Sequence, residues 1–259
     1  MSPFTVDAAQ APGIAEIAAS LPLSLAPARS GPPQLASVAG SPGWATRARD
    51  ALGTGASAVV VSSPSPEENA SAALGTVADR VVLEWAFAAN AGISAAAEAW
   101  SPLRPGIVLA ETHLRVPRGT DLDAGMLDAL TAARRIVGDL SCLRTLHRGK
   151  AGWHAAGLAA GGAPFGIAVV VTDAAPAALC LRLLTRDGGL TVVVPPPDTA
   201  APAAVRIVGP DGERLLPTLW ETSRRTSWRR AVAIAGGRTT SGDVAEFHRT
   251  TVSAGALDG

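Results

Sequence analysis

The sequence predicts an α/β protein in which an abbreviated, Rossmann-like domain with a parallel sheet is followed by an α+β domain with an open, mostly antiparallel sheet. Short apolar strands alternate with helical stretches through residues 35–115, which is typical of a parallel sheet covered by helices. Residues 116–259 begin with an amphipathic helix and continue mainly as strands joined by tight turns, which favours an antiparallel sheet. Residues 1–34 contain six prolines, and we expect them to form an irregular arm.

The first domain is expected to alternate strands with helices. Its strands are uninterrupted apolar runs, as buried strands of a parallel sheet are, and they lie at Leu35–Gly40, Ala58–Ser62, Val81–Phe87 and Ile107–Leu114. Helices should fill the intervals and begin at Ser41, at about Glu67 and at Ile93. Ser41 is suited to cap its helix, because Pro42 follows it in the first helical turn. A further short helix is expected within the arm, at Gly13–Ser20.

The second domain is expected to combine one long helix, several strands and two closing helices. Leu122–Val137 has a broad apolar face and predicts an amphipathic helix. The apolar region Gly161–Leu184 is expected to be helical in its later part, and Gly209–Gly212 predicts the turn of a hairpin. The remaining expected elements are strands at Leu140–Leu146, Leu190–Val194, Ala204–Val208 and Arg214–Leu219, and helices at Ser227–Ala235 and Asp243–Ala254.

The composition is that of a globular chain without a strongly charged partner. Of the 259 residues, 47% are apolar and 17% are charged, which argues against disorder. The formal net charge is zero, so no nucleic-acid partner is expected. No apolar stretch favours a membrane span over a buried element, and the amino terminus lacks a signal-peptide pattern, so we expect a cytoplasmic protein. The two cysteines show no metal-ligand spacing, and no metal site is predicted.

Histidines and carboxylates are the main candidates for proton transfer, because nearly all cations are arginines and the chain contains no tyrosine. Glu111, His113 and Arg115 alternate and therefore share one face of a strand. That face is either a polar site or a solvated edge. His154 follows Trp153 in a predicted loop, where it is a candidate for a ligand pocket or for simple loop packing.

Gly161–Asp173 begins with two glycines, continues as an uncharged apolar run and ends on one carboxylate. Periodicity alone does not decide whether this run is a helix or a strand. Together with the order of the other elements, it resembles the glucose–fructose oxidoreductase/inositol dehydrogenase (Gfo/Idh/MocA) family over residues 35–256. In that family a Gly-Gly pair leads into a helix bearing an Asp, a His four residues on, and a final Asp. The resemblance aligns Asp173 with the final Asp and puts Gly166 and Val170 at the catalytic positions.

The resemblance also implies where a cofactor would bind. A dinucleotide-binding fold needs glycines after its first strand, so that the backbone can approach the pyrophosphate. The only candidate is the turn from Gly40 to Gly43, in which Pro42 removes a donor. The acid expected about 20 residues further on, which would bind the ribose, is missing. The candidate cofactor-binding residues are therefore Gly40, Gly43, Ser62, Ser63 and Pro64, the last two resembling the family's Thr-Pro or Ser-Pro pair over the cofactor.

The family's catalytic lysine is also replaced. Its Glu-Lys-Pro motif stands at Glu84-Trp85-Ala86 in this chain, and Trp85 cannot relay a proton. We expect Val170 to be buried beside Trp85 as a remnant of the lost site. The candidate catalytic residues that remain are Glu84, His113, His154 and Asp173.

Three hypotheses for function follow. The leading one is a catalytically degenerate homologue of this oxidoreductase family that acts as a ligand-binding or structural subunit in a bacterial biosynthetic pathway, with no cofactor expected. The second is an active oxidoreductase with NAD or NADP as cofactor. The third is a non-redox lyase or cyclase that uses the interdomain cleft, where a small-molecule ligand would bind. Because related proteins pair through the second sheet, we expect a homodimer or a heterodimer with a homologue.

Overall fold

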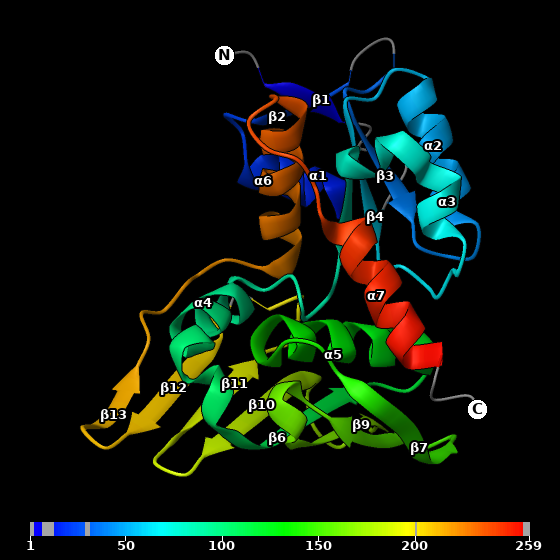
Figure 1. Cartoon of the computed structure of the whole chain (residues 1–259). Helices are drawn as coiled ribbons and strands as arrows, with labels where there is room; N and C mark the ends of the chain where they lie inside the picture. The colour runs from blue at the N-terminus through cyan, green and yellow to red at the C-terminus, as the bar shows by residue number, and fades with distance from the viewer. Residues whose placement is uncertain (1–2, 7–12, 29–31, 200, 256–259) are drawn as a thin grey trace. The chain divides into compact units, whose positions relative to one another are not determined.

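The computed structural model describes residues 3–6, 13–28, 32–199 and 201–255, and the chain folds into two compact units (Figure 1). Unit 1 comprises Met1–Trp85 and Arg224–Arg249, and unit 2 comprises Ala86–Ser223 and Thr250–Gly259. The domain boundaries predicted after residues 34 and 115 are therefore wrong. Unit 1 is completed by a segment from the far end of the chain, and local composition carries no signal for such an association.

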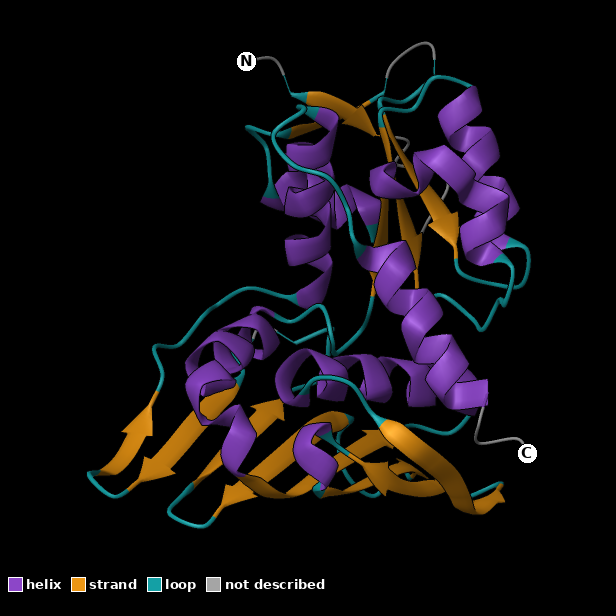
Figure 2. Cartoon of the chain, viewed as in Figure 1, coloured by secondary structure: helices purple, strands orange, loops and turns teal. Residues whose placement is uncertain are grey.

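Unit 1 is built on a parallel sheet, sheet A, with five strands among the described residues (Figure 2). The strands lie in the order β2-β1-β3-β4-β5. They are β1 (Phe4–Val6), β2 (Leu25–Pro27), β3 (Leu35–Ala39), β4 (Ala58–Ser62) and β5 (Val81–Glu84). The expectation of an irregular arm is wrong, because β1 and β2 belong to that segment. Each has only three residues, too few for a pattern to be visible among the prolines.

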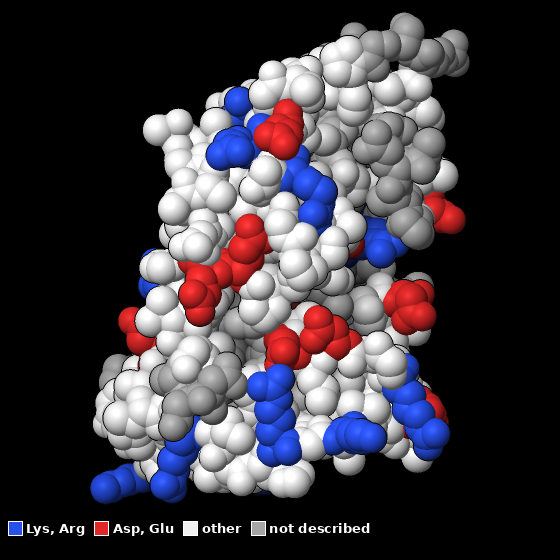
Figure 3. All heavy atoms as spheres, turned by 90° about the vertical axis from the view of Figure 1, so that its right-hand side faces the viewer, with Lys and Arg blue, Asp and Glu red and all other residues white. Residues whose placement is uncertain are grey.

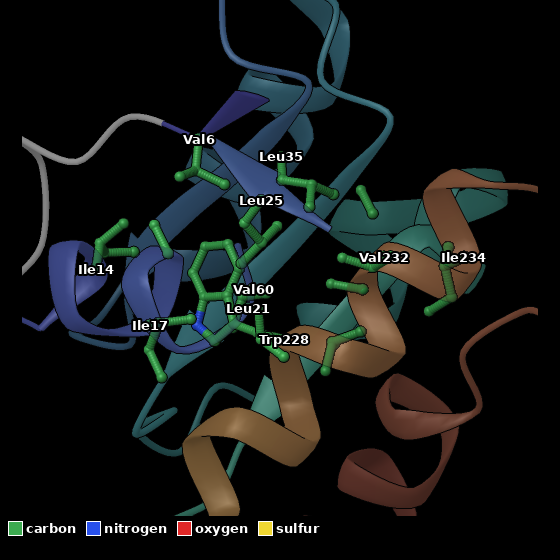
Figure 4. Packing of buried hydrophobic residues seen from close by; sticks show 14 residues of the cluster. Val6, Ile14, Ile17, Leu21, Leu25, Leu35, Val60, Trp228, Val232 and Ile234 are labelled. Atoms are coloured by element: carbon green, nitrogen blue, oxygen red, sulfur yellow. The ribbon is translucent and has the colours of Figure 1, made fainter. Parts of the chain in front are cut away.

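Helices cover both faces of sheet A. On one face, α1 (Ile14–Ser20) and α6 (Ser223–Ala235) enclose a buried apolar cluster that contains Trp228 (Figure 4). On the other face lie α2 (Trp44–Gly53), α3 (Ala70–Leu74) and the 3₁₀ helix η1 (Gly75–Arg80). The helix predicted from about Glu67 begins at Ala70 and ends at Leu74, because Gly75 takes a φ of 53° that ends it. Helix α7 (Asp243–Gly255) completes the described chain.

Unit 2 is built on sheet B, which has eight strands in the order β13-β12-β11-β10-β6-β9-β8-β7 among the described residues. The pair β6–β9 is parallel, and the other neighbours are antiparallel. The strands are β6 (Ile107–Val116), β7 (Ser141–Gly149), β8 (Gly152–Leu158), β9 (Pro164–Val171), β10 (Ala178–Thr185), β11 (Gly189–Val194), β12 (Ala204–Gly209) and β13 (Gly212–Leu215). The predicted hairpin is confirmed, since Gly209 and Gly212 are paired residues at its end.

Two predictions for unit 2 are wrong. Strand β6 lies at the centre of sheet B and not in the parallel sheet, and its alternation of buried and exposed residues is that of a sheet with one open face. Gly161–Leu184 forms β9 and β10 and no helix. In β9 the residues Phe165, Ile167 and Val169 are buried and alternate with less buried ones. This period of two is a strand pattern, and small residues at Gly166 and Ala168 obscure it in the sequence.

Helices α4 (Ala91–Trp100) and α5 (Leu122–Val137) lie on one face of sheet B, and no described helix of unit 2 lies on the other face (Figure 2). Short 3₁₀ helices occur at Ser101–Gly106 and Ala160–Gly162. Val170 points to the open face and is 43% exposed, so the expectation that it is buried is wrong. None of the helices in the described ranges is long and apolar enough to cross a membrane. The face shown in Figure 3 carries small groups of both charge signs.

Candidate functional site

The carboxyl ends of the strands of sheet A bring several predicted site residues together. Gly40 follows β3, and its N–H donates to the carbonyl of Ser62 at 2.8 Å. Its own carbonyl accepts from the N–H of Ser65 at 2.7 Å. The N–H of Ser63 donates to the carbonyl of Glu84 at 3.0 Å. In a parallel sheet these ends meet at one edge, which is where such folds bind ligands.

The turn Gly40–Gly43 is explained by packing and needs no ligand. A Cβ on Gly40 would lie 2.3 Å from the carbonyl oxygen of Ser63 and 2.5 Å from Cα of Pro64, so only glycine fits against this backbone. The carbonyls of the turn point to the guanidinium of Arg47, whose Nη2 donates to Ala39 at 2.9 Å and to Ser41 at 2.6 Å. A turn whose carbonyls hold a cation is unsuited to a pyrophosphate, which requires N–H donors.

The topology of sheet A places the dinucleotide-binding loop elsewhere. Strand β1 has β2 on one side and β3 on the other, so the order of the strands reverses at β1. The pyrophosphate site of such folds lies between the first strand and first helix, at this switch point. The predicted turn Gly40–Gly43 follows β3, one strand away from this switch point. Residues 7–12, which lie outside the described residues, read DAAQAP and contain no glycine, and Gly13 directly precedes α1.

Glu84 is held at the end of β5 by two groups from α6. Its Oε1 lies 3.1 Å from Nε of Arg224, and its Oε2 accepts from the indole N–H of Trp228 at 3.2 Å. The side chain is 8% exposed. Burial raises the pKa of the Glu84 carboxyl, and the Arg224 guanidinium opposes this effect. Because both of its carboxylate oxygens contact side chains of α6, Glu84 links β5 to α6 and has a structural role in unit 1.

Trp85, which replaces the lysine of the family motif, lies in the core of unit 1. It is 2% exposed, and its ring stacks on Phe247 with the centroids 6.1 Å apart. Phe247 in turn meets the edge of Trp44, with centroids 5.3 Å apart. The side chain after Glu84 is therefore directed into an aromatic cluster, and Figure 1 shows α7, which carries Phe247, alongside this part of unit 1.

Unit 2 contains a buried carboxylate that sequence reasoning missed. Asp128 in α5 is 5% exposed, and its two oxygens accept from the N–H groups of Phe87 at 3.0 Å and Ala88 at 2.7 Å. Burial raises the pKa of Asp128 to about 6, although these N–H groups and Arg135 oppose the shift. Arg135 donates to the carbonyl of Ala88 at 2.5 Å. Helix α5 therefore fixes the backbone of Phe87 and Ala88 in unit 2.

No protein-family model and no curated protein matches this sequence. Solved structures, however, resemble it over almost its whole length. UDP-N-acetylglucosamine 3-dehydrogenase from Acidithiobacillus ferrooxidans is 15% identical, with a TM-score of 0.65 over 99% of this chain and 88% of that chain. Levoglucosan dehydrogenase, solved with NADH and levoglucosan, is 13% identical, with a TM-score of 0.68 over 99% and 87%. An oxidoreductase from Sinorhizobium meliloti is 13% identical, with a TM-score of 0.66 over 100% and 97%.

The chain has the fold of the glucose–fructose oxidoreductase/inositol dehydrogenase family. In that family the Asp–His–Asp motif lies on a helix, so the alignment with Gly161–Asp173, which includes strand β9, is wrong. Helix α5 and its cap offer the same spacing, with Asp121 capping the helix and Asp128 seven residues later. Gly125 lies four residues after Asp121, and α5 contains no histidine. The sequence therefore already contained a clue to Asp128: two aspartates seven residues apart, on a helix that the sequence predicts clearly.

The other candidate residues of unit 2 lie at separate positions. His113 on β6 and His154 on β8 are exposed on the open face of sheet B, with Ala168 of β9 between them in the same row. Two strand spacings, about 10 Å, separate the two histidines. Asp173 lies 3.0 Å from Nε of Arg118 and also accepts from the backbone N–H of that residue. Glu84 belongs to the other unit.

His154 was predicted in a loop, and it lies on a strand because β8 begins at Gly152. Trp153 beside it is buried, and its ring lies 4.1 Å from the guanidinium carbon of Arg148. Among the described residues, no group of three or more His, Cys, Asp or Glu side chains is arranged to hold a metal ion. The two candidate histidines of unit 2 therefore lie on an open sheet face.

Proposed function

We propose that this protein is a catalytically degenerate homologue of the oxidoreductases whose fold it has, that it binds no nicotinamide dinucleotide, and that it acts as a structural or ligand-binding subunit. The observation that carries the proposal is the sequence between β1 and α1. A dinucleotide site there requires close backbone approach and free N–H groups at a helix N-terminus. This chain has DAAQAP before Gly13, with an acid that repels a diphosphate and a proline without an N–H.

The missing catalytic groups support the same proposal. Hydride transfer to or from an alcohol needs a group that takes or gives the hydroxyl proton. The family's lysine is replaced by Trp85, which is buried, and α5 has no histidine. The sole lysine of the chain, Lys150, lies exposed in the turn between β7 and β8. The alternative is an active NAD- or NADP-dependent oxidoreductase. It is supported by the similarity in fold to a dehydrogenase solved with NADH.

The open face of sheet B is the surface that we propose for subunit association, with a second copy of the chain or a homologue as partner. In its central row the small Ala168 lies between the exposed His113 and His154, and Val170 and Val193 are partly exposed on the same face. Small and aliphatic side chains between the polar ones let another sheet approach closely. Glu111 and Arg182 face each other across neighbouring strands on this side and supply polar partners.

Two measurements test this proposal. Melting should be unchanged by NAD, NADH, NADP or NADPH at about 1 mM, whereas a Kd of about 10 µM would add about 2.7 kcal/mol and raise the melting temperature by several degrees. Light scattering should give a dimer, and Ala168→Arg at the centre of the open face should weaken it. Ala72→Arg on exposed α3 is the matched control and should leave the dimer intact. A monomeric wild-type chain with no partner recovered from cells would count against the subunit role.

A further inference from the structure

A hollow of about 560 Å³ opens within unit 1 at the amino-terminal edge of sheet A. Ser57 directly precedes β4 and Arg80 directly precedes β5, and both residues line the hollow. Its other wall is the loop between α6 and α7, with Arg238, Thr239 and Thr240. The carboxyl ends of the same strands, where dinucleotide-binding folds hold their ligands, lie a strand length away, about 15 Å. The hollow is therefore separate from the site discussed above.

Arg80 is fixed at the base of this hollow. Its Nε donates to the carbonyl of Ser57 at 2.9 Å, and its Nη2 donates to the carbonyl of Ala56. These bonds orient the guanidinium and leave Nη1 without a partner among the described residues. A guanidinium that is already ordered loses little conformational freedom when it binds an anion.

A second guanidinium is brought to the hollow by the end of α6. Gly237 takes a φ of 67°, and its N–H donates to the carbonyl of Ile234 at 2.9 Å. The N–H of Arg238 donates to the carbonyl of Ala233 at 3.0 Å. These bonds fix the backbone of Arg238 at the rim, while its guanidinium has no hydrogen-bond partner in the described chain.

The loop that carries Arg238 is also tied to the sheet edge. The N–H of Ser241 donates to the backbone carbonyl of Asp79 at 2.7 Å. Asp79 is the one acidic residue of the lining, against the two guanidinium groups of Arg80 and Arg238, so the lining keeps a net positive charge. The hydroxyl groups of Ser57 and Thr240 add neutral donors. The lining thus combines an excess of cationic donors with hydroxyl groups.

We propose that this hollow binds a small oxyanion, the phosphate or carboxylate group of a metabolite, between Arg80 and Arg238. Guanidinium groups pair with such groups through two parallel hydrogen bonds, which gives both strength and orientation. The Asp79 carboxylate lowers the affinity for a bare anion, and it accepts a hydrogen bond from a ligand that also carries a hydroxyl group. The site is independent of the degenerate dinucleotide edge.

The test is an NMR titration of the ¹⁵N-labelled full chain with inorganic phosphate and, separately, with acetate, at constant ionic strength set by chloride. At least one of the two anions should shift the amide signals of Arg238, Thr239 and Thr240 in a saturable way. Tighter binding of phosphate assigns the site to phosphate groups, and tighter binding of acetate assigns it to carboxylates. Absence of saturable shifts with both anions overturns the proposal.

Variants locate the binding within this hollow. Arg238→Gln should weaken it about 10- to 100-fold, because it removes a charged hydrogen-bonding group. Asp79→Asn should tighten it, since a repelling charge is lost. Arg214→Gln on exposed β13 changes the net charge equally and should bind as the wild type does. Equal affinity of the Arg238→Gln variant and the wild type, or an equal loss in Arg214→Gln, refutes the assignment.

Discussion

The buried carboxyl of Asp128 should make the free energy of unfolding depend on pH in a defined window. Its pKa rises from 3.8 to about 6 on folding, so the folded protein keeps a proton that the unfolded chain releases first. The contribution of this group is fully present below pH 3.8 and is lost as the pH rises through about 6. A shift of about two pKa units corresponds to about 3 kcal/mol of unfolding free energy.

Asp128→Asn removes this titration and is the direct test. At about pH 4 the variant should be less stable by about 1–3 kcal/mol. The carboxyl accepts hydrogen bonds from two backbone N–H groups, and in the variant the amide NH₂ faces one of these donors. Toward about pH 7 the wild type alone loses about 3 kcal/mol, so the difference should vanish or reverse. Urea unfolding followed by tryptophan fluorescence over this pH range measures it. Asp187→Asn, an exposed turn carboxyl, is the control and should follow the wild type. Parallel pH profiles of the wild type and Asp128→Asn would refute the reasoning.

Three substitutions test the packing of the candidate site by urea unfolding. Gly40→Ala brings a Cβ within 2.3–2.5 Å of backbone atoms and should lower the free energy of unfolding by about 3 kcal/mol. Gly53→Ala has nothing within 4 Å of its Cβ and should be neutral or stabilising. Equal stability of the two variants would contradict the packing explanation of the turn. Trp85→Lys should cost about 3–5 kcal/mol, because it empties an aromatic cluster and buries an ammonium group. Wild-type stability of that variant would show that Trp85 is no core residue. Val170→His should change the stability of the unassociated chain by no more than about 0.5 kcal/mol, since Val170 is 43% exposed within a single chain. A large loss under conditions where light scattering shows a monomer would mean that Val170 packs within its own unit.

The sequence predicted those elements whose signal is local. Ala58–Ser62, Leu122–Val137 and Asp243–Ala254 each show the period of their structure within a single stretch, and the Gly209–Gly212 turn has its own residue types. Strands β1 and β2 have no such signal, because each contains three residues. Without such a signal, the sequence predicts β3 as the first strand of the sheet and puts the candidate cofactor turn after it, at Gly40–Gly43.

The candidate site was harder to predict because its contacts are long-range. Glu84 is buried by Arg224 and Trp228, which lie 140 and 144 positions away. Asp128 reaches backbone groups 40 and 41 positions away. A carboxylate in an amphipathic helix is expected to be solvent-exposed, and only the structure shows the segment that buries Asp128. The absence of the family's lysine could be predicted without the structure, since the sequence shows Trp85 after Glu84.

We expect the segment between β1 and α1 to hold no dinucleotide. Isothermal titration calorimetry of the full chain with NADH and NADPH tests it most directly, because the heat of binding reports on the cofactor alone. We expect no saturable heat with either cofactor up to about 1 mM, the upper end of ordinary enzyme affinities. A stoichiometric isotherm with a Kd of about 10 µM or tighter, in the usual range for enzyme ligands, would contradict it.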